Sequence, residues 1–161
     1  MTNQAEYRHL HPQFLPDYQT CSPLSIIRID KAPAVLTAAV FVWYQRHNLP
    51  ATPINPTSAT ITALNKEFAT LPSLADLPNP KETSVSIITP PFATRKVLAE
   101  AKQLGIPAVW MQPGTFDDEV MAIAREDGAF EAVVGGEGGR GDEGWCVLVD
   151  GERGLKGVGK L

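Results

Sequence analysis

The segment Val85–Glu126 constrains the fold more than any other part of the chain. It reads as a strand, a Pro90-Pro91 turn, a helix, a second strand, a Pro113-Gly114 turn and a second helix. Strands that alternate with helices are joined by right-handed crossovers and pair into a parallel sheet. Both turns then lie at the carboxyl edge of that sheet, where open α/β folds bind ligands. The sequence therefore predicts a doubly wound α/β fold with a binding crevice at this edge.

The same alternation covers most of the chain and predicts three layers, helices on both faces of a Rossmann-like parallel sheet. Helix 33–46 is apolar on nearly all sides, which is typical of a buried helix. Residues 56–83 are rich in loop-forming residues, and the apolar run 145–149 is a candidate sixth strand. We expect a strand order near 3-2-1-4-5. The five main strands are expected at residues 24–29, 51–55, 83–89, 107–111 and 130–134.

Length and composition indicate one globular domain. The chain has 161 residues, of which 43% are hydrophobic and 20% charged. We expect an N-terminal arm over residues 1–22, the Rossmann-like domain over 23–150 and a C-terminal tail over 151–161.

Charge and hydropathy exclude several classes of partner. The net charge of −4 argues against a nucleic-acid footprint. No apolar run reaches the roughly 18 residues of a membrane span, so we expect no membrane partner. The two cysteines and the absence of a secretory signal predict a cytoplasmic protein.

One glycine pattern and one histidine pattern are weak signals of a binding site. Gly136, Gly138 and Gly141 match the dinucleotide-binding spacing, but an expected strand follows them where the fingerprint needs a helix. We interpret this stretch as a connector. His9 and His11 lack a supporting cluster of cysteines or acids, so no metal site is expected. No Ser-His-Asp or Cys-His set can be assigned, and whether the protein is an enzyme stays open.

Four motifs together resemble a known family. They are ATPINP, TSVSIITPP, GIPAVWMQPG and GWCVLVDG, within about residues 40–150. The chain is thereby similar to the CoA-binding domain family, small Rossmann-fold proteins like the CoA-binding domain of the succinyl-CoA synthetase α-subunit. The resemblance implies CoA or a related nucleotide as the ligand and no metal. The cofactor-binding residues that it implies, with the adjoining Trp110, are Asn55, Pro56, Thr89, Pro90, Pro91, Trp110, Gln112, Pro113 and Gly114.

The first loop departs from the family pattern. Where members carry Gly-Ala-Ser after the first strand, this chain has Arg28, Ile29 and Asp30, followed by Lys31. The glycines of such a loop let the backbone approach a pyrophosphate. Arg28 and Lys31 therefore either bind the anion by charge or mark a site where CoA binding is weakened. We expect weak CoA binding.

Three functions are compatible with this sequence. The first is a small CoA-type or nucleotide-binding protein. The second is an enzyme that uses the same crevice for a small polar metabolite without a classical dinucleotide cofactor. The third is a non-catalytic scaffold or partner protein, in which helix 33–46 offers a surface for a homodimer. For the crevice itself we expect the Thr89 hydroxyl, the Gln112 amide and backbone N–H groups after Gly114 to supply polar contacts.

Overall fold

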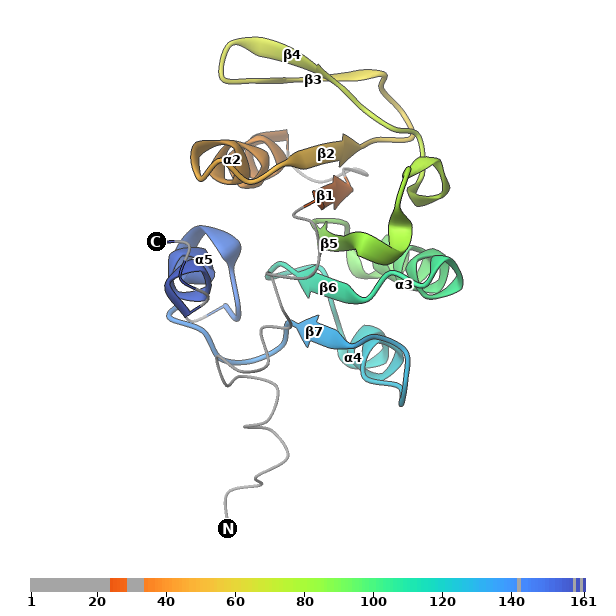
Figure 1. The fold of residues 1–161 in the computed structure, drawn as a ribbon. Coiled ribbons are helices and arrows are strands. Elements are labelled where there is room, and N and C mark those ends of the chain that lie inside the picture. The colour runs from red at the N-terminus through yellow and green to blue at the C-terminus, as the bar shows by residue number, and fades with distance from the viewer. Residues whose placement is uncertain (1–23, 29–33, 142, 158, 160) are drawn as a thin grey trace.

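A five-stranded parallel sheet forms the centre of the molecule (Figure 1). The computed structural model describes residues 24–28, 34–141, 143–157, 159 and 161. The sheet strands are β1 (Leu24–Arg28), β2 (Ala51–Ile54), β5 (Thr83–Ile87), β6 (Ala108–Met111) and β7 (Ala132–Val134). The helices are α2 (Ala34–Arg46), α3 (Pro91–Leu104), α4 (Asp118–Ala124) and α5 (Val147–Gly157), with short 3₁₀ turns at Leu74–Asp76 and Pro80–Glu82.

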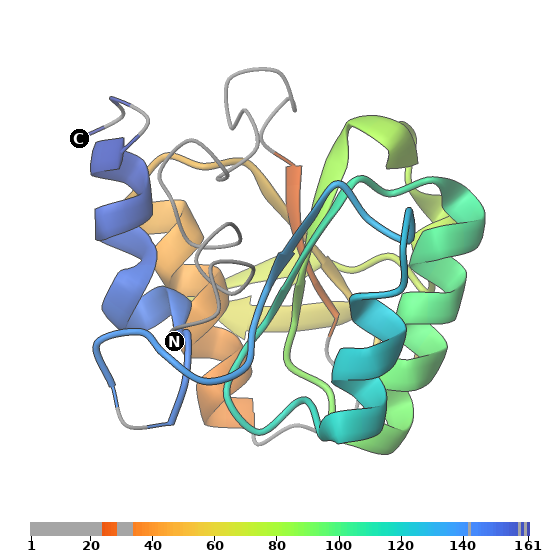
Figure 2. The same ribbon diagram turned by 90° about the horizontal axis from the view of Figure 1, so that it is seen from below.

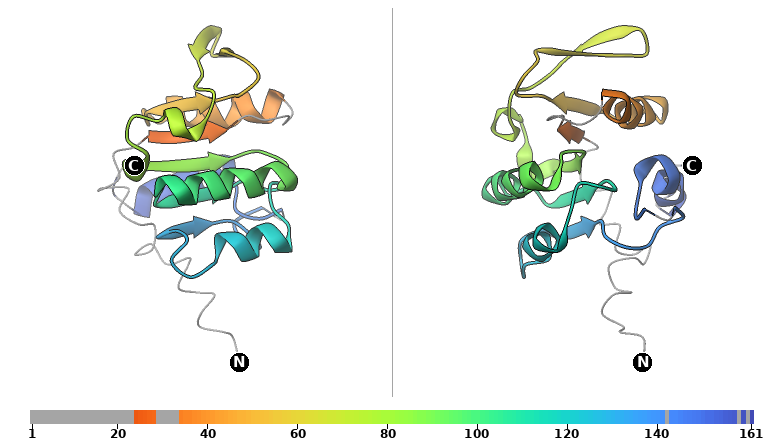
Figure 3. Two further views of the ribbon diagram at one scale, coloured as in Figure 1. Left: turned by 90° about the vertical axis from the view of Figure 1, so that its right-hand side faces the viewer. Right: turned by 180° about the vertical axis from the view of Figure 1, so that it is seen from behind.

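Helices cover both faces of the sheet, which confirms the three-layer α/β architecture. Helices α2 and α5 lie on one face, and α3 and α4 lie on the other (Figure 2). In the left view of Figure 3, α3 and α4 lie in front of the sheet, and in the right view the sheet separates these two helices from α2 and α5. Each layer buries its own core. Val97, Leu98 and Ala101 of α3 are fully buried on one face, and Val40 and Phe41 of α2 on the other.

The strands follow the order β2-β1-β5-β6-β7, so the expected order 3-2-1-4-5 is wrong. Strand β5, the third main strand, pairs with β1 along its whole length, from Leu24 opposite Thr83 to Arg28 opposite Ile87. The outer edge of β2 is already occupied. Leu71 N–H donates to the Pro53 carbonyl (3.0 Å), and Asn55 N–H donates to the Leu71 carbonyl (2.8 Å). The incoming strand therefore pairs on the free side of β1.

An antiparallel hairpin lies beside α2 within the stretch expected to be mainly loop. Its strands are β3 (Thr60–Ala63) and β4 (Lys66–Ala69). The two turn residues, Leu64 and Asn65, both have positive φ (52° and 57°), as a tight I′-type hairpin turn requires. Phe68 packs edge-on against Phe41 with ring centroids 4.8 Å apart. The hairpin thus covers a side of the apolar helix that the sheet leaves open.

Residues 145–149 do not form the expected sixth strand, because α5 begins at Val147. This helix packs closely on α2. An added Cβ at Gly151 would lie 2.4 Å from Cζ2 of Trp43, so only glycine fits there. Helix α2 is consequently enclosed by the sheet, the hairpin and α5, and its Tyr44 is 1% exposed. No helix in the described part of the chain is long and apolar enough to cross a bilayer.

Candidate functional site

The strand order places the topological switch point between β1 and β5. From β1 the chain moves outward to β2, and it later returns to the other side of β1 with β5, β6 and β7. Open α/β sheets bind ligands outside the carboxyl ends of the strands at such a point. Arg28 ends β1 and pairs with Ile54 and Ile87, so its backbone stands at this position. Lys31 lies outside the described residues, and its role stays a prediction.

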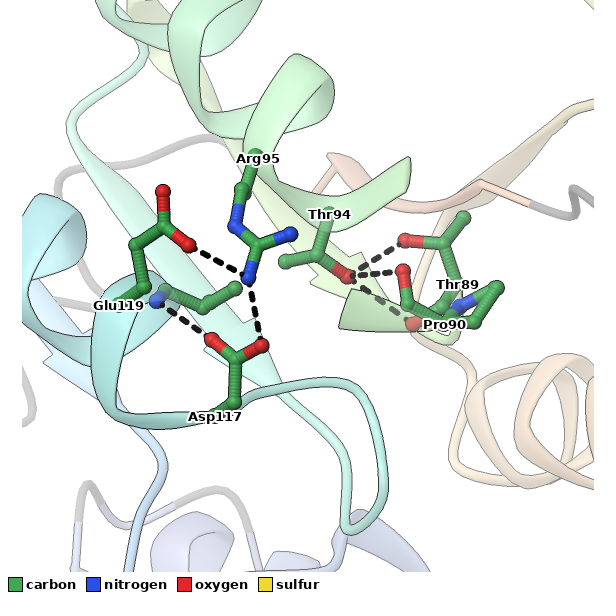
Figure 4. A network of polar contacts seen from close by, with 7 residues as sticks. Thr89, Pro90, Thr94, Arg95, Asp117 and Glu119 are labelled. Carbon is green, nitrogen blue, oxygen red and sulfur yellow. Dashed lines mark hydrogen bonds and ion pairs between the residues drawn. The ribbon is translucent and has the colours of Figure 1, made fainter. Parts of the chain in front are cut away.

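The Thr-Pro-Pro turn follows β5 at the switch point, and buried hydrogen bonds stabilise it (Figure 4). Thr89 is fully buried, and its Oγ1 lies 2.8 Å from Oγ1 of Thr94. The Thr94 hydroxyl also donates to the carbonyls of Thr89 (2.9 Å) and Pro90 (3.2 Å). Pro91 occupies the first position of α3, where a missing N–H does no harm. The Thr89 hydroxyl therefore builds the turn rather than facing outward.

The Gln-Pro-Gly turn follows the neighbouring strand β6. Gln112 N–H donates to the Ile87 carbonyl (3.0 Å), which ties the start of this turn to the end of β5. The Gln112 side chain is 1% exposed and points inward. Its Nε2 donates to Ser86 Oγ (3.2 Å), and its Oε1 accepts from Val147 N–H (2.9 Å). Gln112 thus joins β5 to the first turn of α5, where helical N–H groups lack intrahelical partners.

Gly114, the last residue of this turn, faces solvent, while the buried Thr115 closes the turn behind it. Thr115 N–H donates to the Gln112 carbonyl (3.1 Å), and the Thr115 hydroxyl donates to the same oxygen (2.7 Å). Gly114 has φ +83° and is exposed, with nothing within 4 Å of an added Cβ. Pro113 is half-buried beside it. The turn therefore presents backbone and a proline ring at its surface, and not the amide of Gln112.

The remaining residues implied by the resemblance lie at the same edge or under it. Asn55 follows β2, and its Oδ1 accepts from the N–H (3.0 Å) and the hydroxyl (2.8 Å) of Thr57. Pro56 is exposed next to it. Trp110 is buried on β6 and donates from Nε1 to the Trp145 carbonyl (3.2 Å). Contact between these residues and a ligand stays a prediction.

An ion-pair network joins the helices that follow the two turns, and sequence reasoning missed it. Arg95 of α3 contacts Asp117 Oδ2 (2.6 Å) and Glu119 Oε2 (2.8 Å) through a single nitrogen, Nη2. The other oxygen of Asp117, Oδ1, accepts from Val120 N–H (2.8 Å) and caps α4. Asp117 is thus the cap of this helix. The only sequence signal was the acidic run 117–119, which a solvated first turn explains equally well.

The glycine-rich connector is fixed to α5 by a buried carboxylate. Asp150 is 2% exposed, and its two oxygens accept from the N–H groups of Arg140 (2.9 Å) and Cys146 (3.1 Å). An added Cβ at Gly139 would lie 2.8 Å from Asp150 Oδ2. The connector is followed by a helix, α5, and not by the strand expected from the sequence. The residues before this helix fold back on Asp150.

Phe92 is a second residue that the sequence reasoning did not select. It follows Pro91 in the first turn of α3 and is 58% exposed. Its position off the apolar face of that helix was readable from the spacing of Val97, Leu98 and Ala101.

The titratable side chains of the described residues do not form a metal-type cluster. No group of three or more His, Cys, Asp or Glu side chains there could hold a metal ion. The ammonium group of Lys102 hydrogen-bonds Glu126 and holds the pKa of that carboxyl below its ordinary value.

Together, the parallel sheet, its switch point and the paired proline turns define a Rossmann-type ligand-binding domain. The chain belongs to the CoA-binding domain family, whose model matches residues 31–137. Among curated proteins, no match was found.

Solved structures of archaeal and bacterial proteins share the fold. A hypothetical protein from Pyrococcus horikoshii is 22% identical with a TM-score of 0.62, covering 83% of this chain and 84% of that one. A Thermus thermophilus protein is 23% identical with a TM-score of 0.61, covering 94% and 98%. A conserved hypothetical protein from Pyrococcus furiosus is 19% identical with a TM-score of 0.60, covering 79% and 97%.

Proposed function

We propose that this protein binds CoA or a related nucleotide across the β1/β5 switch point. Family membership supports a small-molecule ligand of this class. The observation that carries the proposal is the placement of the two proline turns. They leave neighbouring parallel strands at one edge, and β5 pairs directly with β1. Neighbouring strands lie about 4.8 Å apart, so one ligand can contact both turns.

The contacts available to the ligand are mainly backbone and ring surfaces. The hydrogen bonds of the Thr89 hydroxyl and the Gln112 amide are made inside the protein. What remains at the surface is the half-buried Pro90 and Pro91, the exposed Gly114 and the exposed ring of Phe92. These groups suit van der Waals contact and backbone hydrogen bonds to the uncharged part of a nucleotide or pantetheine. Asn55 and Pro56 remain our candidates for the nucleoside end.

We propose further that the affinity for CoA is micromolar or weaker. Several backbone N–H groups must approach a pyrophosphate closely, and a Cβ at the first loop position opposes that approach. Arg28 stands at that position, at the end of β1. Charge-assisted contacts from Arg28 and Lys31 would offset part of the loss, at about 1.5–3 kcal/mol each.

Titration calorimetry with CoA tests both statements. The variants are Arg28→Ala and the triple replacement Arg28→Gly, Ile29→Ala and Asp30→Ser. We expect weak saturable binding by the native chain and tighter binding by the triple variant. Nanomolar binding by the native chain that is abolished in Arg28→Ala would overturn the weak-binding proposal. Failure of all three proteins to bind CoA, dephospho-CoA or ADP would overturn the ligand class.

Native mass spectrometry of the purified protein separates the other functions. A co-purified nucleotide supports the proposal. A co-purified small acid or polar metabolite would instead favour an enzyme that uses the crevice without a nucleotide. The same spectrum gives the oligomeric state and so tests a homodimer through α2.

A further inference from the structure

Two adjacent residues of α3, Thr94 and Arg95, make polar contacts close to the two proline turns. Thr94 fastens the Thr-Pro-Pro turn from which its own helix begins, through contacts to Thr89 and Pro90. Arg95 reaches across to the helix that follows the Gln-Pro-Gly turn, where it contacts Asp117 and Glu119 (Figure 4). One turn of α3 is therefore bonded both to the Thr-Pro-Pro turn and to the start of α4, the helix that follows the Gln-Pro-Gly turn.

The geometry of the Arg95 contacts fixes the position of its guanidinium group. Its Nη2 lies between two carboxylates, and one of them, Asp117, caps α4 with its other oxygen. The side chain is only 31% exposed, and its Nε is buried without a hydrogen-bond partner among the described residues. Burial of Nε shows that the guanidinium lies against the protein and not free in solvent. The arginine is held where it bridges the helices.

We propose that Arg95 is a positioning residue that fixes the Gln-Pro-Gly turn relative to the Thr-Pro-Pro turn, and so sets the width of the crevice; its effect on ligand affinity rests on the function proposed above. Backbone pairing already joins Ile87 to Met111 and to Gln112 N–H, but it ends there. Beyond that point, the N-terminal parts of α3 and α4 are joined by the contacts of Arg95 with Asp117 and Glu119. Loss of the bridge lets the turns separate, and only the correctly spaced fraction of molecules binds ligand.

The chain contains a matched control for this proposal. Lys102, in the last turn of α3, pairs with Glu126, just after α4. This ion pair joins the same two helices at the opposite end, away from the crevice. A general loosening of the helix pair would follow from the loss of either bridge, whereas a change in the crevice would follow only from the loss of Arg95.

The test compares Arg95→Met and Asp117→Asn with Lys102→Gln. Asparagine still caps a helix, so Asp117→Asn removes the charge and keeps the acceptor for Val120 N–H. Calorimetric titration with CoA should show about fivefold weaker binding for Arg95→Met, and a smaller loss for Asp117→Asn because Arg95 keeps its contact to Glu119. Binding by Lys102→Gln should match the native protein. The double variant of Arg95 and Asp117 should bind no worse than Arg95→Met, because Arg95→Met already removes both contacts of the bridge.

Several outcomes would overturn the proposal. Equal losses of affinity in Arg95→Met and Lys102→Gln would show a general structural effect. Native affinity for CoA in Arg95→Met would show that Arg95 has no positioning role. Tighter CoA binding by Asp117→Asn would show that Arg95, once released, contacts the ligand anion itself.

Hydrogen exchange separates this proposal from the proposed function. If the native chain does not bind CoA, the ligand class is wrong, but the bridge is still testable. Arg95→Met should speed exchange of the Thr115 amide, which closes the Gln-Pro-Gly turn on the Gln112 carbonyl. Lys102→Gln should instead speed exchange of the Ala129 amide, which donates to Glu126. An unchanged rate at Thr115 in Arg95→Met would overturn the positioning role.

Discussion

Replacement of Gln112 by methionine is the sharpest test of how the Gln-Pro-Gly turn works. Methionine preserves the approximate volume and removes both polar contacts. Val147 N–H, which is fully buried, loses its acceptor at 2.9 Å, and an unsatisfied buried donor costs about 1–3 kcal/mol. Ser86 loses a longer contact at 3.2 Å, worth about 0.5–1.5 kcal/mol. We expect a loss of about 2–4 kcal/mol in the free energy of unfolding.

Urea denaturation measures this loss directly, and a thermal melt should show a fall of roughly 5–15 °C for a domain of this size. Ser86→Ala is the control, because it breaks only the weaker contact and should lose about 1 kcal/mol. A Gln112→Met protein within about 0.5 kcal/mol of the native one would refute the reasoning. So would a protein of native stability that loses only its affinity for CoA, because that result would make Gln112 a ligand contact.

Three other perturbations have expected outcomes. Thr94→Val, which removes the hydroxyl that holds the Thr-Pro-Pro turn, should lower stability in urea by about 1–3 kcal/mol. Gly151→Ala should destabilise by about 1–3 kcal/mol despite the better helix propensity of alanine, because its Cβ meets the Trp43 ring, and Trp43→Leu should relieve part of this in a double-mutant melt. Lys102→Gln should raise the pKa of Glu126 toward its ordinary value of 4.5 in an NMR titration. Since Lys102 lowers that pKa, the charged pair stabilises the protein above the ordinary value, and this contribution is lost as the pH falls through the folded-state pKa.

The fold class could be predicted because strands, turns and helices alternate clearly along the sequence. The strand–turn–helix sequence of Val85–Glu126 appears in the structure as β5, α3, β6 and α4. The proline within ATPIN also fits its place. Pro53 lies on β2, which is the edge strand of the five-stranded sheet. Local patterns of this kind identify the elements but not which strands become neighbours.

The strand order depended on contacts that no local pattern reveals. Leu71 covers the outer edge of β2, and nothing in its sequence neighbourhood marks it as a pairing residue. The hairpin before it was missed for a similar reason. Residues 60–63 and 66–69 are short, and the turn between them has leucine, not the usual asparagine or glycine, at its first left-handed position.

Helix α5 shows tertiary contacts overriding local preference. The run Trp145–Val149 is β-branched and aromatic enough to predict a strand. In the structure, Gln112 accepts from Val147 N–H and Asp150 accepts from Cys146 N–H, so distant and local side chains together satisfy the start of a helix. Of these two contacts, only the one between Cys146 and Asp150 joins residues close enough in the sequence to be predicted from it.

The candidate site was predictable in location and not in detail. Thr89 and Gln112 were selected as polar groups, but a sequence cannot say whether such groups face solvent or the interior. Here Thr94 and Val147 are their partners, five and 35 residues away. The Arg95 bridge depends likewise on a residue 22 positions along the chain.

Mapping the binding site of CoA on the ¹⁵N-labelled native protein by NMR tests the central claim most directly. If CoA binds at the carboxyl edge, addition of CoA should shift the backbone amide signals of Phe92, Gly114 and Thr115, which lie in the two proline turns or directly beside them. The signals of Gly105 and Gly128, which precede β6 and β7 at the opposite edge, should stay in place. Shifts confined to Gly105 and Gly128, or no shifts at millimolar CoA, would contradict a CoA site at this crevice.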